Sequence, residues 1–104
     1  MRRGEIWRVT SPTGLRTVLV VSISEANDAY RVAVVLDLRD AQSAPDTMLA
    51  VTIKEPVAVS AFAMNLMQLN AARFDPAGGA ERLGSASDAD LARVWEAIKA
   101  VLGP

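Results

Sequence analysis

Residues 14–22 read GLRTVLVVS, a run in which one arginine stands at the start of a stretch that is otherwise typical of a buried strand. Threonine and valine make up most of the run after Arg16, and such β-branched residues favour strands. A charged side chain in a buried strand is costly unless it has a partner or a task. Arg16 is therefore the first residue of this sequence that requires an explanation.

Short strands and turns are expected on both sides of this run. Residues 6–10 alternate apolar and polar side chains, and Ser-Pro-Thr-Gly at 11–14 supplies a turn. Further strands are expected at 17–23, 30–36, 48–53 and 57–62, with turns at 25–28 and 54–56 and loops at 40–46 and 75–79. Residues 65–74 predict a short strand followed by a turn.

The C-terminal segment has the clearest pattern. Ser87 followed by Asp90 resembles a capping box, and Gly103 and Pro104 end the pattern. Between them apolar residues recur at helical spacing: Leu91, Val94, Trp95, Ile98, Val101 and Leu102. We expect a helix that packs one face on the sheet, with Trp95 in the core. Several strands before one helix predict an α+β fold, a small β-barrel or curled antiparallel sheet with a C-terminal α-helix.

Length and composition predict a single domain over residues 1–104. The chain has 104 residues, of which 51% are hydrophobic, so a core of ordinary size is expected. No apolar run approaches the roughly 18 residues that span a bilayer, so we expect no membrane contact and a cytoplasmic location. The net charge is −1, but residues 1–39 hold more basic than acidic side chains, which indicates a weakly basic face.

The residue types limit the chemistry. The sequence has no histidine and no cysteine, which excludes imidazole bases, catalytic thiols and the metal sites that these ligands build. No metal ion and no cofactor are expected. Arginine, carboxylate, hydroxyl and amide groups remain, and this set suits phosphodiester chemistry with an RNA 2′-hydroxyl as the nucleophile.

A hairpin places Arg16 near a carboxylate. A turn centred near Asn27 makes residues whose numbers sum to about 53–55 neighbours across two strands, so Arg16 lies beside Asp37, Leu38 and Arg39. If Asp37 stands opposite, the two form an ion pair with a purely structural role. The residues alone leave the structural and the functional interpretation of Arg16 equally open.

Two segments resemble a known family. RGEIWRV at 3–9 and RTVLVVS at 16–22 are similar to the R-G-(E/D)-I-(W/Y) and R-P-V-L-V-V-S motifs of the MazF/PemK/Kid toxins of type II toxin–antitoxin systems. Gly-Ser-Ala-Ser at 84–87, followed by the terminal helix, resembles the end of these chains. The resemblance implies an SH3-like barrel of the PemK/MazF/CcdB type that forms a homodimer, is inhibited by a small acidic antitoxin, and cleaves single-stranded RNA without a metal ion.

The resemblance also implies roles for individual residues. Arg16 matches the arginine that stabilises the phosphate in the transition state. Asp37 is the second catalytic candidate, because a shift of one residue places it where active members carry a threonine; the ungapped alignment places Leu38 there instead. Arg8, Arg31 and Arg39 are candidates for contacts to the RNA backbone.

Some positions depart from the family pattern. Thr17 replaces the usual proline, the first loop at 11–15 is shorter, and NLMQ at 65–68 replaces a charged segment. These departures keep a non-catalytic alternative open: a protein that acts by binding, as CcdB does on DNA gyrase, or a homologue that titrates an antitoxin. Met64 and Met67, with the apolar residues at 61–66, are expected in the core or in the dimer interface.

Overall fold

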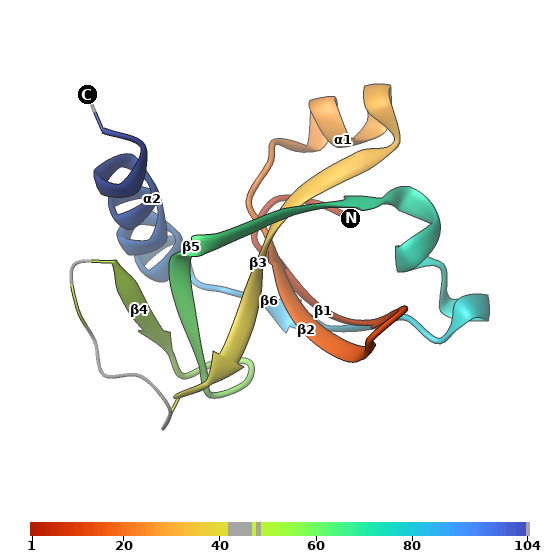
Figure 1. Cartoon of the computed structure of the whole chain (residues 1–104), viewed down its shortest axis with the longest axis horizontal. Coiled ribbons are helices and arrows are strands. Elements are labelled where there is room, and N and C mark those ends of the chain that lie inside the picture. The colour runs from red at the N-terminus through yellow and green to blue at the C-terminus, as the bar shows by residue number, and fades with distance from the viewer. Residues whose placement is uncertain (42–46, 48, 104) are drawn as a thin grey trace.

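The computed structural model describes residues 1–41, 47 and 49–103 (Figure 1). Its strands are β1 (Glu5–Ser11), β2 (Gly14–Val20), β3 (Val32–Asp40), β4 (Ala50–Ile53), β5 (Val59–Asn70) and β6 (Glu81–Ser85). Its helices are α1 (Ser24–Tyr30) and α2 (Asp88–Leu102), with the 3₁₀ turns η2 (Ala71–Phe74) and η3 (Pro76–Gly78). None of the described helices is long and apolar enough to cross a membrane.

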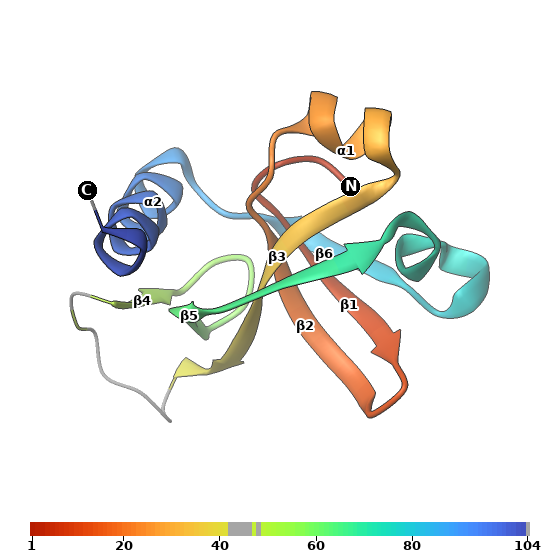
Figure 2. The same cartoon turned by 45° about the horizontal axis from the view of Figure 1, so that its top comes forward.

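The six strands form one antiparallel sheet in the order β4-β5-β3-β2-β1-β6. The sheet curls into an open half-barrel (Figure 2), as the α+β prediction requires. Val18 pairs with Asp37 and Val20 with Val35, so the numbers of facing residues sum to 55, within the predicted register. The predicted antiparallel pairing of β2 with β3 is confirmed, although helix α1 and not a turn connects the two strands.

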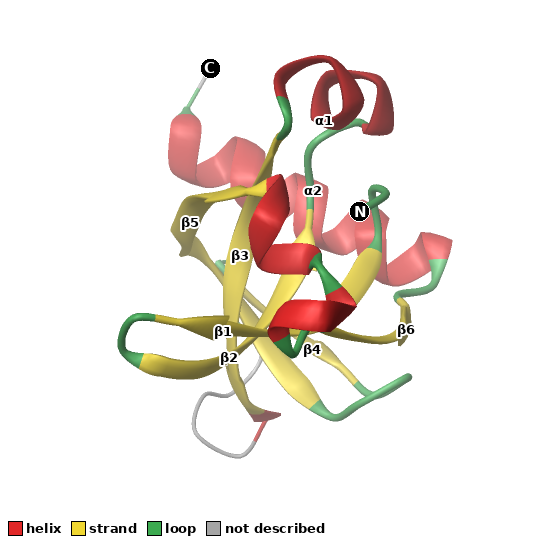
Figure 3. Ribbon diagram, turned by 90° about the vertical axis from the view of Figure 1, so that its right-hand side faces the viewer, coloured by secondary structure: helices red, strands yellow, loops and turns green. Residues whose placement is uncertain are grey.

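Two apolar clusters fill the two sides of the curled sheet. One surrounds Leu19 and Leu36 and is closed by α2. The other surrounds Val18 and Val20 and is closed by Phe74 of η2. Figure 3 shows α2 on one side of the sheet and the 3₁₀ turns on the other. Because successive residues of β2 enter different clusters, the strand is apolar on both faces, which explains the unbroken apolar run in the sequence.

The N-terminal segment is fixed to the sheet by Gly4 and Glu5. Gly4 has φ +93°, and a Cβ at this position would lie 2.8 Å from a side-chain carbon of Leu91 in α2. The Glu5 carboxylate accepts a hydrogen bond from the Trp7 indole at 3.1 Å and pairs with Arg82 of β6 at 2.7 Å. Glu5 therefore ties β6 to the start of β1.

The environment of Glu5 predicts a pH dependence of stability. Burial acts to raise the pKa of Glu5, but hydrogen bonds from the Arg2 backbone, Trp7 and Arg82, together with the N-terminal ammonium, outweigh it and lower the pKa. A lowered carboxyl pKa stabilises the fold above the ordinary glutamate value of about 4.3, and this stabilisation is lost as the pH falls through the folded-state pKa. We expect Glu5→Gln to lower the Tm at neutral pH and expect its difference from the unmodified chain to shrink below about pH 4.

Thermal melts over a pH series test this expectation. Glu81→Gln is the matched control, because Glu81 is exposed on β6 and pairs with Arg8 only at 3.7 Å. The control is expected to change the Tm little at any pH. A Tm difference for Glu5→Gln that stays constant into acid would show that the Glu5 charge does not stabilise the fold.

The turn expected at 25–28 is wrong, since these residues lie inside helix α1. The reason is Asn27, whose buried side chain donates to the carbonyl of Met1 at 3.1 Å and accepts from the Ser22 hydroxyl. A contact with the chain terminus leaves no local sequence signal. The neighbouring strands shift accordingly: β2 ends at Val20 rather than at residue 23, and β3 runs from Val32 to Asp40.

The strands expected at 57–62 and within 65–74 are parts of one strand, β5. Leu36 pairs with Leu66 and Leu38 with Ala61, so residues 62–65 of β5 stand opposite Asp37 alone, and this irregularity hides the continuity of the strand. Pairing of β4 with β5 is confirmed.

Some predictions fall on residues that the structure does not describe. These are residues 42–46 of the loop expected at 40–46, the predicted strand start at 48, and Pro104.

The segment between β5 and α2 departs from the expected loop. Residues 75–79, expected as a loop, contain η3, and β6 follows as a mostly exposed strand with no apolar alternation to predict it.

Ser87 caps α2 as predicted, accepting from the backbone of Asp90 at 3.1 Å. Trp95, however, is 48% exposed rather than in the core, because Val94 and Ile98 take the positions that face the sheet.

Candidate functional site

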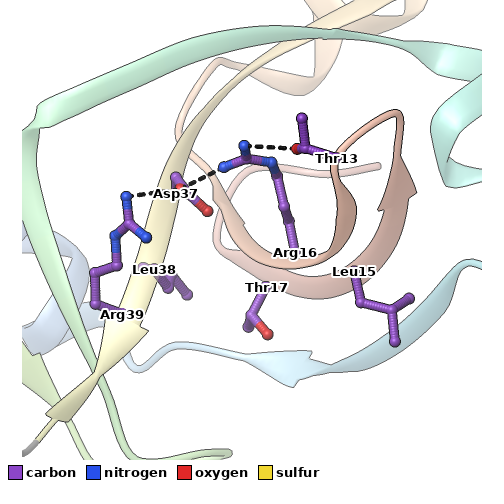
Figure 4. A pocket seen from close by; sticks show the side chains of 7 residues that line it. All are labelled: Thr13, Leu15, Arg16, Thr17, Asp37, Leu38 and Arg39. Atoms are coloured by element: carbon purple, nitrogen blue, oxygen red, sulfur yellow. Dashed lines mark hydrogen bonds and ion pairs between the residues drawn. The ribbon is translucent and has the colours of Figure 1, made fainter.

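A depression of about 390 Å³ opens where β2 and β3 separate (Figure 4). The two strands are paired only from Val18 to Val20 of β2, opposite Val35 to Asp37 of β3. Before Val18, β2 continues beside β1, and beyond Asp37, β3 continues beside β5. The lining of this fork consists of Thr13, Leu15, Arg16, Thr17, Asp37, Leu38 and Arg39.

Three charged side chains meet in the fork. Arg16 Nη1 lies 2.7 Å from Asp37 Oδ2, and Arg39 Nη2 lies 3.4 Å from the same oxygen. The side chain of Asp37 is only 10% exposed, whereas that of Arg39 is 61% exposed. The cluster therefore carries two positive charges around one mostly buried carboxylate, and its net charge remains positive.

Strand geometry explains the pairing. Asp37 stands opposite Val18, and Arg16 lies two residues before Val18 on the same face of β2. Diagonal neighbours of this kind are within reach of a long side chain. The ion pair anticipated from the sequence thus forms across the diagonal, where the strands have already begun to part.

The β1–β2 turn also contacts the guanidinium. Arg16 Nε donates to Ser11 Oγ at 3.3 Å, and Arg16 Nη2 donates to Thr13 Oγ1 at 3.0 Å. Figure 4 shows Arg16 between Thr13 and Asp37, with Leu15 and Thr17 pointing the other way. Sequence reasoning missed Ser11 and Thr13, whose only signal was their place in a turn close to Arg16.

Arg8 and Arg31, predicted to contact the RNA backbone, lie outside the fork. Arg8 is exposed on β1 and pairs with Glu81 at 3.7 Å. Arg31 follows α1 with φ +58° and lines a separate depression of about 510 Å³ with Asn27 and Asp28. Of the five predicted site residues, the structure brings together Arg16, Asp37 and Arg39.

Leu38 does not face Arg16. Its side chain is buried and belongs to the cluster closed by α2, on the face of β3 opposite to Asp37. Alternation along a strand makes this inevitable, because successive side chains point to opposite faces. Asp37, not residue 38, therefore occupies the position beside the arginine. No group of three or more acidic, histidine or cysteine side chains suited to a metal ion occurs among the described residues.

Comparison with known proteins gives a match in structure alone. Neither protein-family models nor curated proteins match the sequence. A solved mycobacterial endoribonuclease, in complex with its cognate antitoxin, superposes with a TM-score of 0.86 at 20% identity, over 99% of this chain and 95% of that one. The chain has the MazF fold. MazE-MazF from Deinococcus radiodurans gives a TM-score of 0.80 at 21% identity, covering 99% of this chain and 95% of that one.

MazF of Deinococcus radiodurans determined by itself gives a similar result, with a TM-score of 0.79 at 19% identity over 100% of this chain and 97% of that one. The fold expected from the sequence resemblance is thereby confirmed along almost the whole chain. At these identities the agreement concerns the fold.

Proposed function

We propose that this chain is the toxin of a type II toxin–antitoxin pair and that it cleaves single-stranded RNA at specific sequences without a metal ion. The observation that carries the proposal is the cluster of Arg16, Asp37 and Arg39 in an open depression of a MazF fold. The similarity to an endoribonuclease that was solved with its cognate antitoxin supports the same conclusion.

The cluster supplies the groups that such a cleavage needs. Asp37 accepts the proton of the ribose 2′-hydroxyl, and the 2′ oxygen then attacks the adjacent phosphorus. The bond from phosphorus to the 5′ oxygen breaks, and the leaving oxygen takes a proton from water, whose hydroxide then takes the proton held by Asp37. The products are a 2′,3′-cyclic phosphate and a 5′-hydroxyl end. Arg16 and Arg39 stabilise the charge that builds on the non-bridging phosphate oxygens.

Positive charge remains available for the substrate in spite of Asp37. Arg39 is largely exposed at the rim and contacts Asp37 only at 3.4 Å, so it is free to meet a phosphate. Arg8 and Arg31 lie outside the fork and are proposed only for contacts to more distant phosphates, which position RNA without reading its sequence.

We propose two protein partners in the cytoplasm. The first is a second copy of the chain, because β3 and β5 expose the apolar side chains of Val34, Phe62 and Met64. The neighbouring Ala61 and Ala63 are buried in the core, one of the two places expected for the apolar residues at 61–66, so they add nothing to this surface. The second partner is a small acidic antitoxin, whose negative charge complements the basic excess of residues 1–39.

A non-catalytic role is the second candidate, and a specific observation favours it. Asp37 already neutralises Arg16 at 2.7 Å, and Leu38 brings no hydroxyl to the site. A protein of this kind acts by binding, either to a target such as gyrase or to an antitoxin that it titrates. It binds its partner but leaves RNA intact.

Incubation of the purified chain with single-stranded RNA, with and without excess EDTA, separates the two candidates. We expect cleavage at a limited set of sites and the same rate in EDTA, because the proposed mechanism uses only protein side chains. Intact RNA under both conditions would support the binding protein, and cleavage that EDTA abolishes would contradict the mechanism.

A further inference from the structure

The turn between β1 and β2 is a compact unit that Ser11 holds together. Ser11 pairs with Gly14 across the hairpin, and only Pro12 and Thr13 lie between them. The Ser11 hydroxyl donates to the Gly14 carbonyl at 2.8 Å and accepts from the backbone N–H of Thr13 at 3.3 Å. Gly14 has φ +121°, which an L side chain rarely adopts. The conformation of the turn is thus fixed by its own side chains.

The hydroxyls of Ser11 and Thr13 face one edge of the Arg16 guanidinium. Nε donates to Ser11 Oγ at 3.3 Å and Nη2 donates to Thr13 Oγ1 at 3.0 Å, while the two hydroxyl oxygens lie 3.1 Å apart. This is the bidentate geometry that arginine forms with paired acceptors. Two turn hydroxyls here take the place that the two oxygens of a carboxylate occupy in an ion pair.

Arg16 lines the depression and has donors left for a ligand there. A guanidinium has five N–H donors. Within the described part of the chain, Arg16 uses one for Ser11, one for Thr13 and one for Asp37, so two are left for a ligand. The hydroxyls are neutral, so they hold the arginine in place and leave its charge intact. Asp37, in contrast, cancels that charge.

We infer that Ser11 and Thr13 are positioning residues, which hold Arg16 in the orientation that presents its free donors to the phosphate. This role in cleavage rests on the proposed function. The placement of the guanidinium does not, since the hydrogen bonds are made without a substrate. When a phosphate approaches and draws Arg16 away from Asp37, the turn keeps two of the three contacts.

The test compares Thr13→Val, which removes the acceptor at nearly constant shape, with Thr13→Ser, which keeps it. Thr10→Val, at an exposed threonine of β1, is the matched control. The first readout is the exchange of the Arg16 Nε proton with water, followed by NMR on protein with isotope-labelled arginine and assigned by its loss in Arg16→Lys. The second is kcat and KM for RNA cleavage.

For Thr13→Val we expect faster exchange and a kcat lowered by about 10- to 100-fold, the usual cost of a misplaced catalytic group. The KM is expected to change by less than about threefold, since the charge of Arg16 remains. Thr13→Ser and Thr10→Val are expected to behave like the unmodified chain. Ser11→Ala, which removes the Nε acceptor directly, is expected to accelerate exchange at least as much.

The outcomes separate the inference from the proposed function. Faster exchange in Thr13→Val with no RNA cleavage by any variant would overturn the function and support the placement of Arg16 by the turn. Exchange and kcat in Thr13→Val equal to those of the unmodified chain would overturn the positioning role, even if RNA is cleaved. A loss of kcat in Thr10→Val equal to that in Thr13→Val would also overturn it.

Discussion

Replacement of Arg16 by alanine is expected to lower the rate of RNA cleavage by about 10²- to 10³-fold, the usual loss when one preorganised charge-stabilising donor is removed. The expected cost in stability is small, about 1–2 kcal/mol. The reason is Arg39, which lies 3.4 Å from Asp37 and leaves that carboxylate paired after Arg16 is removed. Single-turnover cleavage and thermal melts measure the two effects separately.

Arg16→Lys and Arg2→Ala are the controls for this prediction. The lysine variant keeps a positive charge but loses the planar guanidinium that contacts Ser11, Thr13 and Asp37, so an intermediate rate is expected. Arg2 is exposed near the N-terminus, and its replacement tests the general effect of one lost charge. A large fall in Tm with cleavage lost only through unfolding would show that the ion pair is structural.

Replacement of Asp37 by asparagine is expected to reduce cleavage by about 10²- to 10⁴-fold, the range for loss of a general base. Asparagine has the same shape but cannot accept the 2′-hydroxyl proton at neutral pH. It also removes the charge that neutralises Arg16, so RNA binding is expected to tighten while the chemical step slows. Cleavage rate and the Kd for a DNA oligonucleotide of the same sequence, which lacks the nucleophile, measure the two effects.

Asp28→Asn controls for the loss of one negative charge, because Asp28 is exposed on α1 outside the fork. It is expected to leave cleavage unchanged. Tighter binding with undiminished cleavage in Asp37→Asn would remove Asp37 from the catalytic step and leave it as the counter-ion of Arg16 alone.

Much of the fold could be predicted because its signals are local. The apolar run after Arg16 predicted β2, a connection centred near Asn27 predicted its register with β3 although that connection is helical, and Ser87 marked the start of α2. What failed depends on distant contacts. Helix α1 is anchored by Asn27 to the carbonyl of Met1, and β6 is an exposed strand recognised only by its pairing with β1.

The candidate site was predictable to a similar extent. A charged residue at the start of an apolar strand indicated a functional role for Arg16, and the register of β2 with β3 predicted Asp37 and Arg39 as its neighbours. Ser11 and Thr13 could not be found, because the direction of a turn hydroxyl depends on the conformation of the turn. The resemblance left open whether residue 37 or 38 stands beside Arg16, and the side-chain alternation of β3 places Asp37 there.

The chemical identity of the product ends tests the central claim most directly, that Arg16 and Asp37 cleave RNA through its own 2′-hydroxyl. The measurement is the mass of the 5′ fragment released by the unmodified chain in excess EDTA. The account predicts a fragment that ends in a 2′,3′-cyclic phosphate, and none from Arg16→Ala in the same time. A fragment that ends in a 3′-hydroxyl, with phosphate on the other product, would contradict it, because water would then be the nucleophile.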